Sequence, residues 1–396
     1  MKKVVRLLKK CWNYGRQYLI DNIISKIFLL FPVQKRIMFE SLPDIGDSTK
    51  EVYEEMLRRG INEEYEFLWY LHRRTENLPS VKNVKFLTGK NRLLFLYYEY
   101  TSACLISSNM FLLSHSKRQK SFSISHGSTI KSLVGYYYLP KKVDYYISAS
   151  EDSGRILAKM MNIPPQKEAY LGLPRNDEFS RPQKDIHGLF TTDYNKLIVW
   201  YPTYRQHKSG GHNTGAKRAI PILHNADSAR QLNEVAKSCN VLFVIKPHFA
   251  QDVKYISELE LSNIKFINDQ FLEARNINSY ELVHAADALI SDYSSIYFDY
   301  LLTDKPVALV WEDIEEYRRN PGFGVDLSYY CKGATKVYTL SDLEAFVHEL
   351  KRGVDLLKEE RKEICTLVNY SDDGKNTKRV VDFICKNTKQ LNKYVR

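Results

Sequence analysis

The residue best suited to acid–base chemistry in this sequence is His126, which directly follows a predicted strand. The alternating run Ser121–Ser125 leads into this histidine, and Gly127 and Ser128 come next. Gly127 leaves room for a substrate to approach the backbone. A neutral imidazole at the open edge of a sheet can accept a proton from a hydroxyl nucleophile, because its ordinary pKa lies near the working pH. His126 is therefore a candidate general base, and a hydrogen-bonded structural histidine is the alternative.

A candidate phosphate site follows another predicted strand, Ala288–Ile290, and contains Asp292, Ser294 and Ser295. Both serines fall where the next helix should begin. Free N–H groups and the positive end of a helix attract phosphate, and serine hydroxyls add further donors. Ordinary capping of the helix by serine is the alternative explanation.

Three further segments place basic residues at strand ends or in turns. Lys246 and His248 close the predicted strand Val241–Ile245, Arg175 stands in a turn, and Arg205 follows another strand. A cation beside an imidazole suits an anion, and arginine can hold phosphate with two parallel hydrogen bonds. Each segment alone could be solvated surface charge. Together, the five segments predict a cleft for a ligand with two or more negative charges.

Several enzyme classes lack their motifs in this sequence. It has no G-x-x-x-x-G-K-[ST] loop, no G-x-G-x-x-G after the first strand and no G-x-S-x-G elbow, which disfavours kinases, P-loop ATPases, nicotinamide dehydrogenases and serine hydrolases. No Asp-x-Asp pair occurs in the cleft segments, so we predict no required metal. The six cysteines lie far apart and form no C-x-x-C pair, which favours reduced, buried thiols in a cytosolic protein.

These segments must be positioned by alternating strands and helices. The first series of predicted strands is Arg36–Glu40, Phe67–Tyr70, Val84–Phe86, Cys104–Ile106, Phe122–Ser125 and Tyr145–Ser148, and the second is Leu197–Tyr201, Val241–Lys246, Ile264–Ile267, Ala288–Asp292 and Val307–Val310. Helical patterns such as Thr49–Gly60 and Ala226–Ser238 separate several of them. Such alternation is typical of parallel sheets covered by helices on both faces.

Eleven strands are many for one doubly wound sheet, so we expect two Rossmann-like α/β domains that face each other across a cleft. The polar segment Arg181–Asn195 is the expected boundary. It separates an N-terminal domain at residues 34–185 from a C-terminal domain at residues 190–396. In such domains, ligands bind beyond the carboxyl ends of the strands. The basic, glycine-rich segment 206–219 is expected to be a loop.

The formal net charge of +11 is concentrated at the N-terminus, where residues 1–36 carry nine basic side chains and one acid. Placed on a helix, this start has an apolar face with Trp12 and a basic face with Lys2, Lys3, Arg6, Lys9 and Lys10. Such a helix can lie in the surface of an anionic membrane. We therefore predict membrane association through residues 1–33 and no nucleic-acid partner. A helix packed on the body of the protein is the alternative.

At the level of motifs, the sequence resembles the CDP-glycerol glycerophosphotransferases of teichoic-acid and related capsule synthesis. The matching segments are Phe39-Glu40-Ser41, Ser125-His126-Gly127-Ser128, Gly172-Leu173-Pro174-Arg175-Asn176-Asp177, Pro202-Thr203-Tyr204-Arg205, Lys246-Pro247-His248, Ser291-Asp292-Tyr293-Ser294-Ser295, Phe298-Asp299, Lys305-Pro306 and Asp373-Gly374. The resemblance spans nearly the whole body of the chain. It implies a GT-B fold, an acceptor-binding first domain and a second domain that binds the CDP donor.

The resemblance also implies roles for the candidate residues. His126 would be the general base for the acceptor hydroxyl, and His248 would be the second catalytic histidine. His248, Arg205, Ser294 and Ser295 would hold the donor pyrophosphate, with support from Arg175. The remaining candidate substrate-binding residues are Gly127, Ser128, Lys246 and Asp292. No cofactor is expected beyond CDP-glycerol itself as the donor substrate.

By the same resemblance, glycerol phosphate would pass to a lipid-linked glycan or polyol-phosphate acceptor at the cytoplasmic face of the cell membrane, with release of CMP. Long polymerases of the family carry a further N-terminal domain. Its absence here leads us to expect a primase-like single addition or a compact capsule polymerase. The alternatives are a CDP-ribitol ribitolphosphotransferase, a GT-B glycosyltransferase that uses a nucleotide sugar, and a membrane-docked module that binds teichoic polymer.

Overall fold

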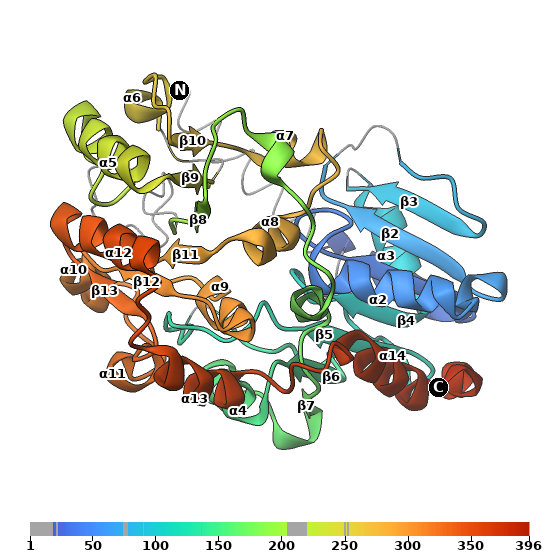
Figure 1. Ribbon diagram of the computed structural model, residues 1–396. Helices are drawn as coiled ribbons and strands as arrows, with labels where there is room; N and C mark the ends of the chain where they lie inside the picture. The colour runs from blue at the N-terminus through green and yellow to red at the C-terminus, as the bar shows by residue number, and fades with distance from the viewer. Residues whose placement is uncertain are drawn as a thin grey trace, which may run out of the picture.

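The computed structural model describes residues 19–20, 23–73, 78–89, 91–135, 137–203, 220–248, 251 and 253–395. These residues form two parallel sheets, each covered by helices (Figure 1). In the part of the chain that the structure describes, no helix has the length and hydropathy of a membrane-spanning segment.

The first sheet belongs to the N-terminal half and has the strand order β3-β2-β1-β4-β5-β6-β7. Its strands are β1 (Gln34–Glu40), β2 (Glu66–Leu71), β3 (Val84–Thr88), β4 (Ser102–Ser107), β5 (Lys120–Ile124), β6 (Tyr145–Ser148) and β7 (Glu168–Tyr170). Every neighbouring pair is parallel.

The second sheet repeats this topology with the order β10-β9-β8-β11-β12-β13. Its strands are β8 (Lys196–Trp200), β9 (Val241–Ile245), β10 (Ile264–Phe266), β11 (Ala288–Ser291), β12 (Val307–Val310) and β13 (Thr335–Val337). In both sheets the strand order reverses beside the first strand, which is the Rossmann arrangement whose ligands bind at that reversal. The predicted fold of two Rossmann-like units is therefore present.

Helices connect the strands of both sheets. In the N-terminal half they are α2 (Asp47–Arg58), α3 (Arg92–Thr101) and α4 (Glu151–Met161), with the 3-10 helices η1 (Ile24–Leu30) and η4 (Pro174–Ser180). In the C-terminal half they are α5 (Ala226–Cys239), α6 (Lys254–Ser257), α7 (Asp269–Glu273), α8 (Ser279–Ala285), α9 (Ile296–Tyr300), α10 (Ile314–Arg319), α11 (Leu327–Tyr330), α12 (Leu340–Arg352), α13 (Lys358–Val368) and α14 (Asn376–Asn387).

The ends of these helices follow from local residue chemistry. The side chain of Asn225 accepts a hydrogen bond from Ser228 N at the start of α5, and the Ser228 side chain returns a bond to the backbone of Asn225. The helix stops at Asn240, which adopts the left-handed conformation at φ 53°. Reciprocal capping and a left-handed asparagine are the signals that begin and end helices.

The strands are buried on both faces because helices cover both sides of each sheet. In β8, Leu197 and Val199 pack with Tyr293 in one apolar cluster, while Trp200 packs with Leu232 of α5 in the cluster on the opposite face. This explains why the strands read as continuous apolar runs rather than as alternating ones.

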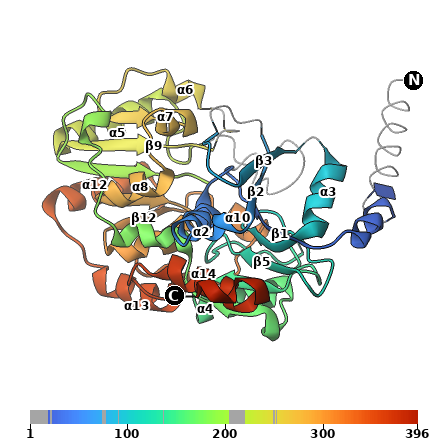
Figure 2. The same ribbon diagram turned by 90° about the vertical axis from the view of Figure 1, so that its right-hand side faces the viewer.

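The C-terminal helix α14 does not stay with the second sheet. Its residues Val380, Val381 and Ile384 complete the apolar core beneath the first sheet, with Phe39 of β1. Figures 1 and 2 show this helix, in dark red, beside the N-terminal half. The end of the segment 190–396, assigned by sequence to the second domain, therefore packs on the first. The reason is its apolar face, which the first sheet buries.

Candidate active site

His126 lies in the loop that follows β5, with its side chain 55% exposed. Its Nδ1 atom lies 3.4 Å from Oδ2 of Asp47, the first residue of α2. Because a carboxylate only accepts hydrogen bonds, this contact favours a proton on Nδ1 and leaves Nε2 as the basic nitrogen. The imidazole is thus oriented as a general base requires.

Asp47 remains ionised because of its neighbours. Burial alone would raise its pKa, but the charge of Arg175 and the contact with His126 lower the pKa far below its ordinary value. The Nη1 atom of Arg175 lies 2.9 Å from Oδ1 of Asp47. The position at the start of α2 adds the favourable end of the helix dipole. The carboxylate therefore supports His126 throughout the neutral pH range.

Arg175 joins the two halves of the molecule at this point. Its Nη2 atom donates to the carbonyl oxygen of His126 at 2.7 Å and to Oδ2 of Asp299 in α9 at 2.8 Å. Tyr280 donates its hydroxyl to the same carboxylate oxygen of Asp299 at 2.7 Å. The guanidinium is nearly buried, with 8% of the side chain exposed. Asp47 and Asp299 accept hydrogen bonds from the guanidinium N–H groups that we expected to bind phosphate. This geometry therefore suits a residue that positions His126.

Gly127 is required by the conformation of this loop. Its φ angle is +104°, and a Cβ atom at this position would lie 2.7 Å from Nη2 of Arg175. Any larger residue would push Arg175 away from the His126 carbonyl. The glycine therefore holds the candidate base and the arginine in contact.

Ser294 and Ser295 lie where the sequence predicted, between β11 and α9. Both line a pocket of about 290 Å³ together with His126, Gly127 and Ser128. The hydroxyl of Ser295 donates to the carbonyl oxygen of His126 at 3.3 Å, so the second half of the chain meets the candidate base directly.

Lys246 and His248 follow β9. They lie at the same carboxyl edge of the second sheet as Ser294 and Ser295, which follow β11. Lys246 forms an ion pair with Asp269 at 2.7 Å. Partial burial lowers the pKa of His248, and the positive charges of Lys246 and Lys131 lower it further, although Asp269 acts in the opposite direction. Lys131 also lines the pocket of His126. Lys131 thus acts on His248 electrostatically, although neither His248 nor Lys246 is among the residues that line the pocket of His126.

Two other candidates have structural partners. Asp292 is fully buried, and its carboxylate accepts hydrogen bonds from the backbone N–H and hydroxyl of Thr203 and from Tyr293 N. Asp292 therefore holds Thr203, which follows β8, in place. The hydroxyl of Ser128 donates to the carbonyl oxygen of Val368 at 3.3 Å, although the residue lines the pocket.

The remaining sequence candidates lie outside the described residues. They are Arg205 and the N-terminal residues Lys2, Lys3, Arg6, Lys9, Lys10 and Trp12. Their roles stay predictions. Among the described residues, no group of His, Cys, Asp or Glu is arranged to hold a metal ion. The five cysteines in this part of the chain are free thiols, and four of them are buried.

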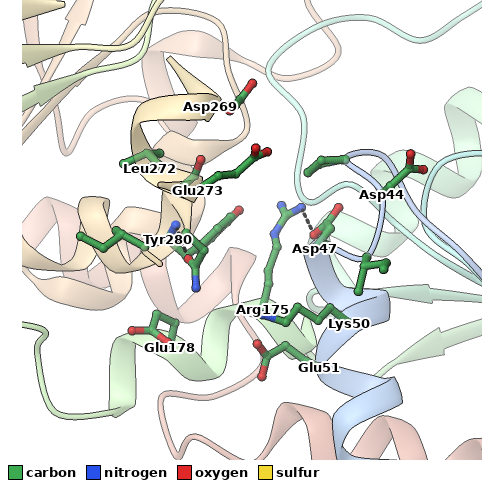
Figure 3. A pocket seen from close by; sticks show the side chains of 16 residues that line it. Asp44, Asp47, Lys50, Glu51, Arg175, Glu178, Asp269, Leu272, Glu273 and Tyr280 are labelled. Carbon is green, nitrogen blue, oxygen red and sulfur yellow. Dashed lines mark hydrogen bonds and ion pairs between the residues drawn. The ribbon is translucent and has the colours of Figure 1, made fainter. Parts of the chain in front are cut away.

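A second pocket, of about 370 Å³, lies on the other side of the Asp47–Arg175 contact (Figure 3). It separates α2 from α7 and α8, and carboxylates line it from both sides: Asp44, Asp47, Glu51, Glu178, Asp269 and Glu273. Such a charge excess repels phosphate. This charge makes the second pocket a poor candidate for a phosphate site.

The family model described as CDP-Glycerol:Poly(glycerophosphate) glycerophosphotransferase matches residues 23–386. The chain belongs to this family. The resemblance inferred from the motifs is thus confirmed, and the protein is an enzyme of the glycerophosphotransferase class that serves teichoic-acid synthesis.

This glycerophosphotransferase has curated relatives among teichoic-acid enzymes. It is 26% identical over 382 residues to the teichoic acid poly(ribitol-phosphate) polymerase of Bacillus spizizenii, which covers 90% of this chain and 57% of the relative. It is 23% identical over 334 residues to the teichoic acid glycerol-phosphate primase of Bacillus subtilis, which covers 78% of this chain and 81% of the relative. The chain therefore spans little more than half the length of the first of these relatives.

Solved structures share the fold of this glycerophosphotransferase. The wall teichoic acid polymerase TagF superposes with a TM-score of 0.71 at 20% identity, over 98% of each chain. A complex of Staphylococcus aureus MnaA with UDP gives a TM-score of 0.53 at 12% identity, over 90% of this chain and 98% of that one. The architecture is therefore GT-B-like, as predicted.

The sequence did not reveal the partners of His126. Asp47 follows a glycine at the start of a helix, which is also where an ordinary capping acid stands. Asp299 lies in the family-like segment Phe298-Asp299, but nothing in that segment indicates a contact with Arg175. Only the fold brings these carboxylates to Arg175, which is 128 residues from Asp47 and 124 residues from Asp299.

Proposed function

We propose that this glycerophosphotransferase moves glycerol phosphate from CDP-glycerol to a hydroxyl of a membrane-linked acceptor, with His126 as the general base. The observation that carries the proposal is the contact between His126 and Asp47. It keeps Nε2 free to accept a proton at the mouth of a pocket shared by both halves of the chain.

The donor pyrophosphate would lie on the second half of the chain. Ser294 and Ser295 line the pocket there, and Lys131 and Lys246 are the cations that act on nearby His248. Arg205, which follows β8 in the sequence and lies outside the described residues, is a further candidate for the same role. Fixed cations and hydrogen-bond donors stabilise the charge that develops on the phosphoryl oxygens and on the leaving group.

The chemical step is one displacement at phosphorus. The acceptor hydroxyl attacks the β-phosphorus, on the glycerol side of the pyrophosphate, and passes its proton to Nε2 of His126. The bond from this phosphorus to the bridging oxygen breaks, and CMP leaves with that oxygen. The imidazolium then returns its proton to solvent. Arg175 and Asp47 hold the base in place and do not touch the reacting atoms.

Work at the membrane surface is part of this proposal. Residues 1–18 lie outside the described part of the chain, but η1 follows shortly after them with exposed apolar side chains at Ile27, Leu30 and Phe31. Leu30 is 83% exposed. Apolar residues after a basic segment suit the interface of an anionic bilayer. We place the enzyme at the cytoplasmic face, where a lipid-linked acceptor is within reach of the cleft.

Sedimentation with anionic liposomes tests this placement. The full chain should pellet, whereas a chain without residues 1–33 should stay in the supernatant. A variant with glutamine in place of Lys2, Lys3, Arg6, Lys9 and Lys10 separates charge from apolar burial, because it retains the apolar face. Equal pelleting of all three proteins contradicts the proposed placement.

CDP-ribitol is the rival donor, because the ribitol-phosphate polymerase of Bacillus spizizenii is among the curated relatives. The mechanism would be unchanged. CMP release measured with CDP-glycerol, CDP-ribitol and a UDP-sugar, each with a lipid-linked acceptor, identifies the donor. We expect the highest kcat/KM for CDP-glycerol. UDP release from the sugar nucleotide without CMP release from either CDP-alcohol would contradict the proposed function.

A further inference from the structure

The loop that carries His126 is anchored in the second half of the chain. Ile130, which follows His126 in this loop, is fully buried in one apolar cluster with Tyr293 and Tyr297. The other buried residues of this cluster all lie at position 186 or later. Because burial of apolar surface is the main force that holds packed segments together, Ile130 fixes this loop of the first half to the core of the second half.

The backbone on both sides of Lys131 is also paired with the second half. The amide of Gly324 donates to the carbonyl oxygen of Ile130 at 2.9 Å. The amide of Ser132 donates to the carbonyl oxygen of Gly322 at 3.0 Å. A Cβ atom at Gly324 would lie only 2.9 Å from the carbonyl oxygen of Lys131, so the two segments approach as closely as glycine allows. Lys131 is therefore held in place by the second half.

The segment that holds Lys131 is packed against the loop with the candidate phosphate-binding serines. Phe323 is the partner of Lys131 in an antiparallel bridge, and its ring stacks on Tyr317 with the centroids 5.8 Å apart. The ring of Tyr317 in turn stacks on Tyr293 with the centroids 3.7 Å apart. Tyr293 directly precedes Ser294. Lys131 and Ser294 therefore belong to one packed unit, although they come from different halves of the chain.

The charge of Lys131 suits an anionic ligand in the pocket of His126. Lys131 lines this pocket together with Ser294 and Ser295. Among the described residues that line it, Lys131 is the one lysine or arginine, and none is an aspartate or glutamate. An ammonium group beside serine hydroxyls is a common arrangement for phosphate oxygens, because it combines a point charge with hydrogen-bond donors.

We propose that Lys131 binds the pyrophosphate of the CDP-alcohol donor together with Ser294 and Ser295. This inference rests on the proposed function and adds a cation of the first half to its donor site. Lys131 keeps its proton and forms no covalent bond. Its charge would offset the negative charge on the phosphoryl oxygens and on the departing CMP. One short loop would then carry both the base for the acceptor, His126, and a cation for the donor.

The first test measures the Kd for CDP-glycerol by calorimetry in Lys131→Met. The Kd should rise about 10- to 100-fold, the effect of losing a hydrogen bond between charged groups. Lys131→Arg should recover most of the affinity, because it restores the charge. Lys141→Met is the matched control, since Lys141 lies in the same connection between β5 and β6 but is exposed and does not line the pocket. A wild-type Kd for Lys131→Met would overturn the inference.

The KM for the lipid-linked acceptor distinguishes the donor from the acceptor as the partner of Lys131. It should stay near the wild-type value in Lys131→Met, measured by CMP release. A higher KM for the acceptor with an unchanged Kd for CDP-glycerol would assign Lys131 to the acceptor, and the inference would be wrong while the proposed function stands. Failure of CDP-glycerol to bind the wild-type protein would count against both.

A second test concerns the anchor. Ile130→Ala should raise the Kd for CDP-glycerol, although Ile130 is not among the residues that line the pocket. Ile364→Ala is the matched control, because Ile364 is fully buried in the same cluster but lies in α13. Both variants lose the same atoms from one core and should lose stability. Only Ile130→Ala should weaken donor binding.

A double variant separates this positioning role from a general loss of stability. If Ile130 acts through Lys131, the combination of Ile130→Ala with Lys131→Met should have the same Kd for CDP-glycerol as Lys131→Met alone. Thermal unfolding of the same samples establishes that each variant is folded. Additive losses in the double variant, or equal Kd values for Ile130→Ala and Ile364→Ala, would contradict the anchoring of Lys131 by Ile130.

Discussion

Asp47 Oδ2 and His126 Nδ1 lie 3.4 Å apart, although the two residues follow different strands of the first sheet. The pair is held from the other half of the chain, since Asp299 and Ser295 contact Arg175 and the His126 carbonyl. The candidate base and its carboxylate therefore both come from the first half, and Asp299 and Ser295 of the second half brace them through Arg175 and the His126 carbonyl. This relationship makes the orientation of one imidazole sensitive to residues that never meet the substrate.

Replacing Asp47 with asparagine should lower kcat about 10²-fold and leave the KM for CDP-glycerol nearly unchanged. The asparagine amide can donate to Nδ1, which moves the ring proton to Nε2 and removes the basic site. Steady-state CMP release measures the effect. Asp227→Asn, at the exposed start of α5, is the matched control and should behave like the wild type. A wild-type kcat for Asp47→Asn would refute the orienting role.

Asp299→Ala should destabilise the folded protein by about 3–5 kcal/mol, because it leaves a nearly buried guanidinium with one carboxylate in place of two. The midpoint of urea unfolding measures this change. Arg230→Ala breaks the exposed pair with Asp227 and should cost less than about 1 kcal/mol. Equal midpoints for the two variants would show that Arg175 does not depend on Asp299.

Gly127→Ala should also be destabilising, by about 1–3 kcal/mol, since a positive φ angle disfavours every residue with a Cβ atom. The new methyl group would also displace Arg175, so kcat should fall together with stability. Gly188→Ala, where no atom lies within 4 Å of the added Cβ, provides the comparison. A fully active, fully stable Gly127→Ala protein would contradict the described loop.

Donor binding should take up a proton at His248. The pKa of this residue lies below its ordinary value of about 6.5 in the free protein, and a bound pyrophosphate should raise it. Between the two pKa values the complex holds more protons than the free enzyme, so affinity for CDP-glycerol should decrease as pH rises through this window. Isothermal titration calorimetry in buffers of different ionisation enthalpy measures the uptake. His248→Asn should abolish it, and uptake that persists in this variant would exclude His248 as the source.

Much of the architecture was predictable because its determinants are local. The apolar run Val241–Ile245 and the helical pattern Ala226–Ser238 correctly predicted β9 and α5. The strands β7 and β13 were missed because each has only three residues and one buried side chain, Ala169 in β7 and Val337 in β13. The helix α14 was assigned to the wrong half, since its amphipathic pattern does not say which sheet buries the apolar face.

The sequence predicted which motifs form the candidate site, but it did not predict which of their side chains contact one another. Residues that follow strands were expected at one edge, and His126, Ser294 and Ser295 do line one pocket. Arg175 was read as a phosphate ligand because a lone arginine in a turn has no visible partner in the sequence. Its carboxylates come from α2 and α9, and long-range pairs of this kind depend on the packing of the whole fold.

The most direct test of the central claim is the turnover of His126→Ala with CDP-glycerol and a lipid-linked acceptor, measured as CMP release alongside calorimetric binding of the donor. We predict that kcat falls about 10²–10⁴-fold while the affinity for CDP-glycerol stays within twofold of the wild type. A folded His126→Ala protein with near wild-type kcat would contradict the assignment of His126 as the general base.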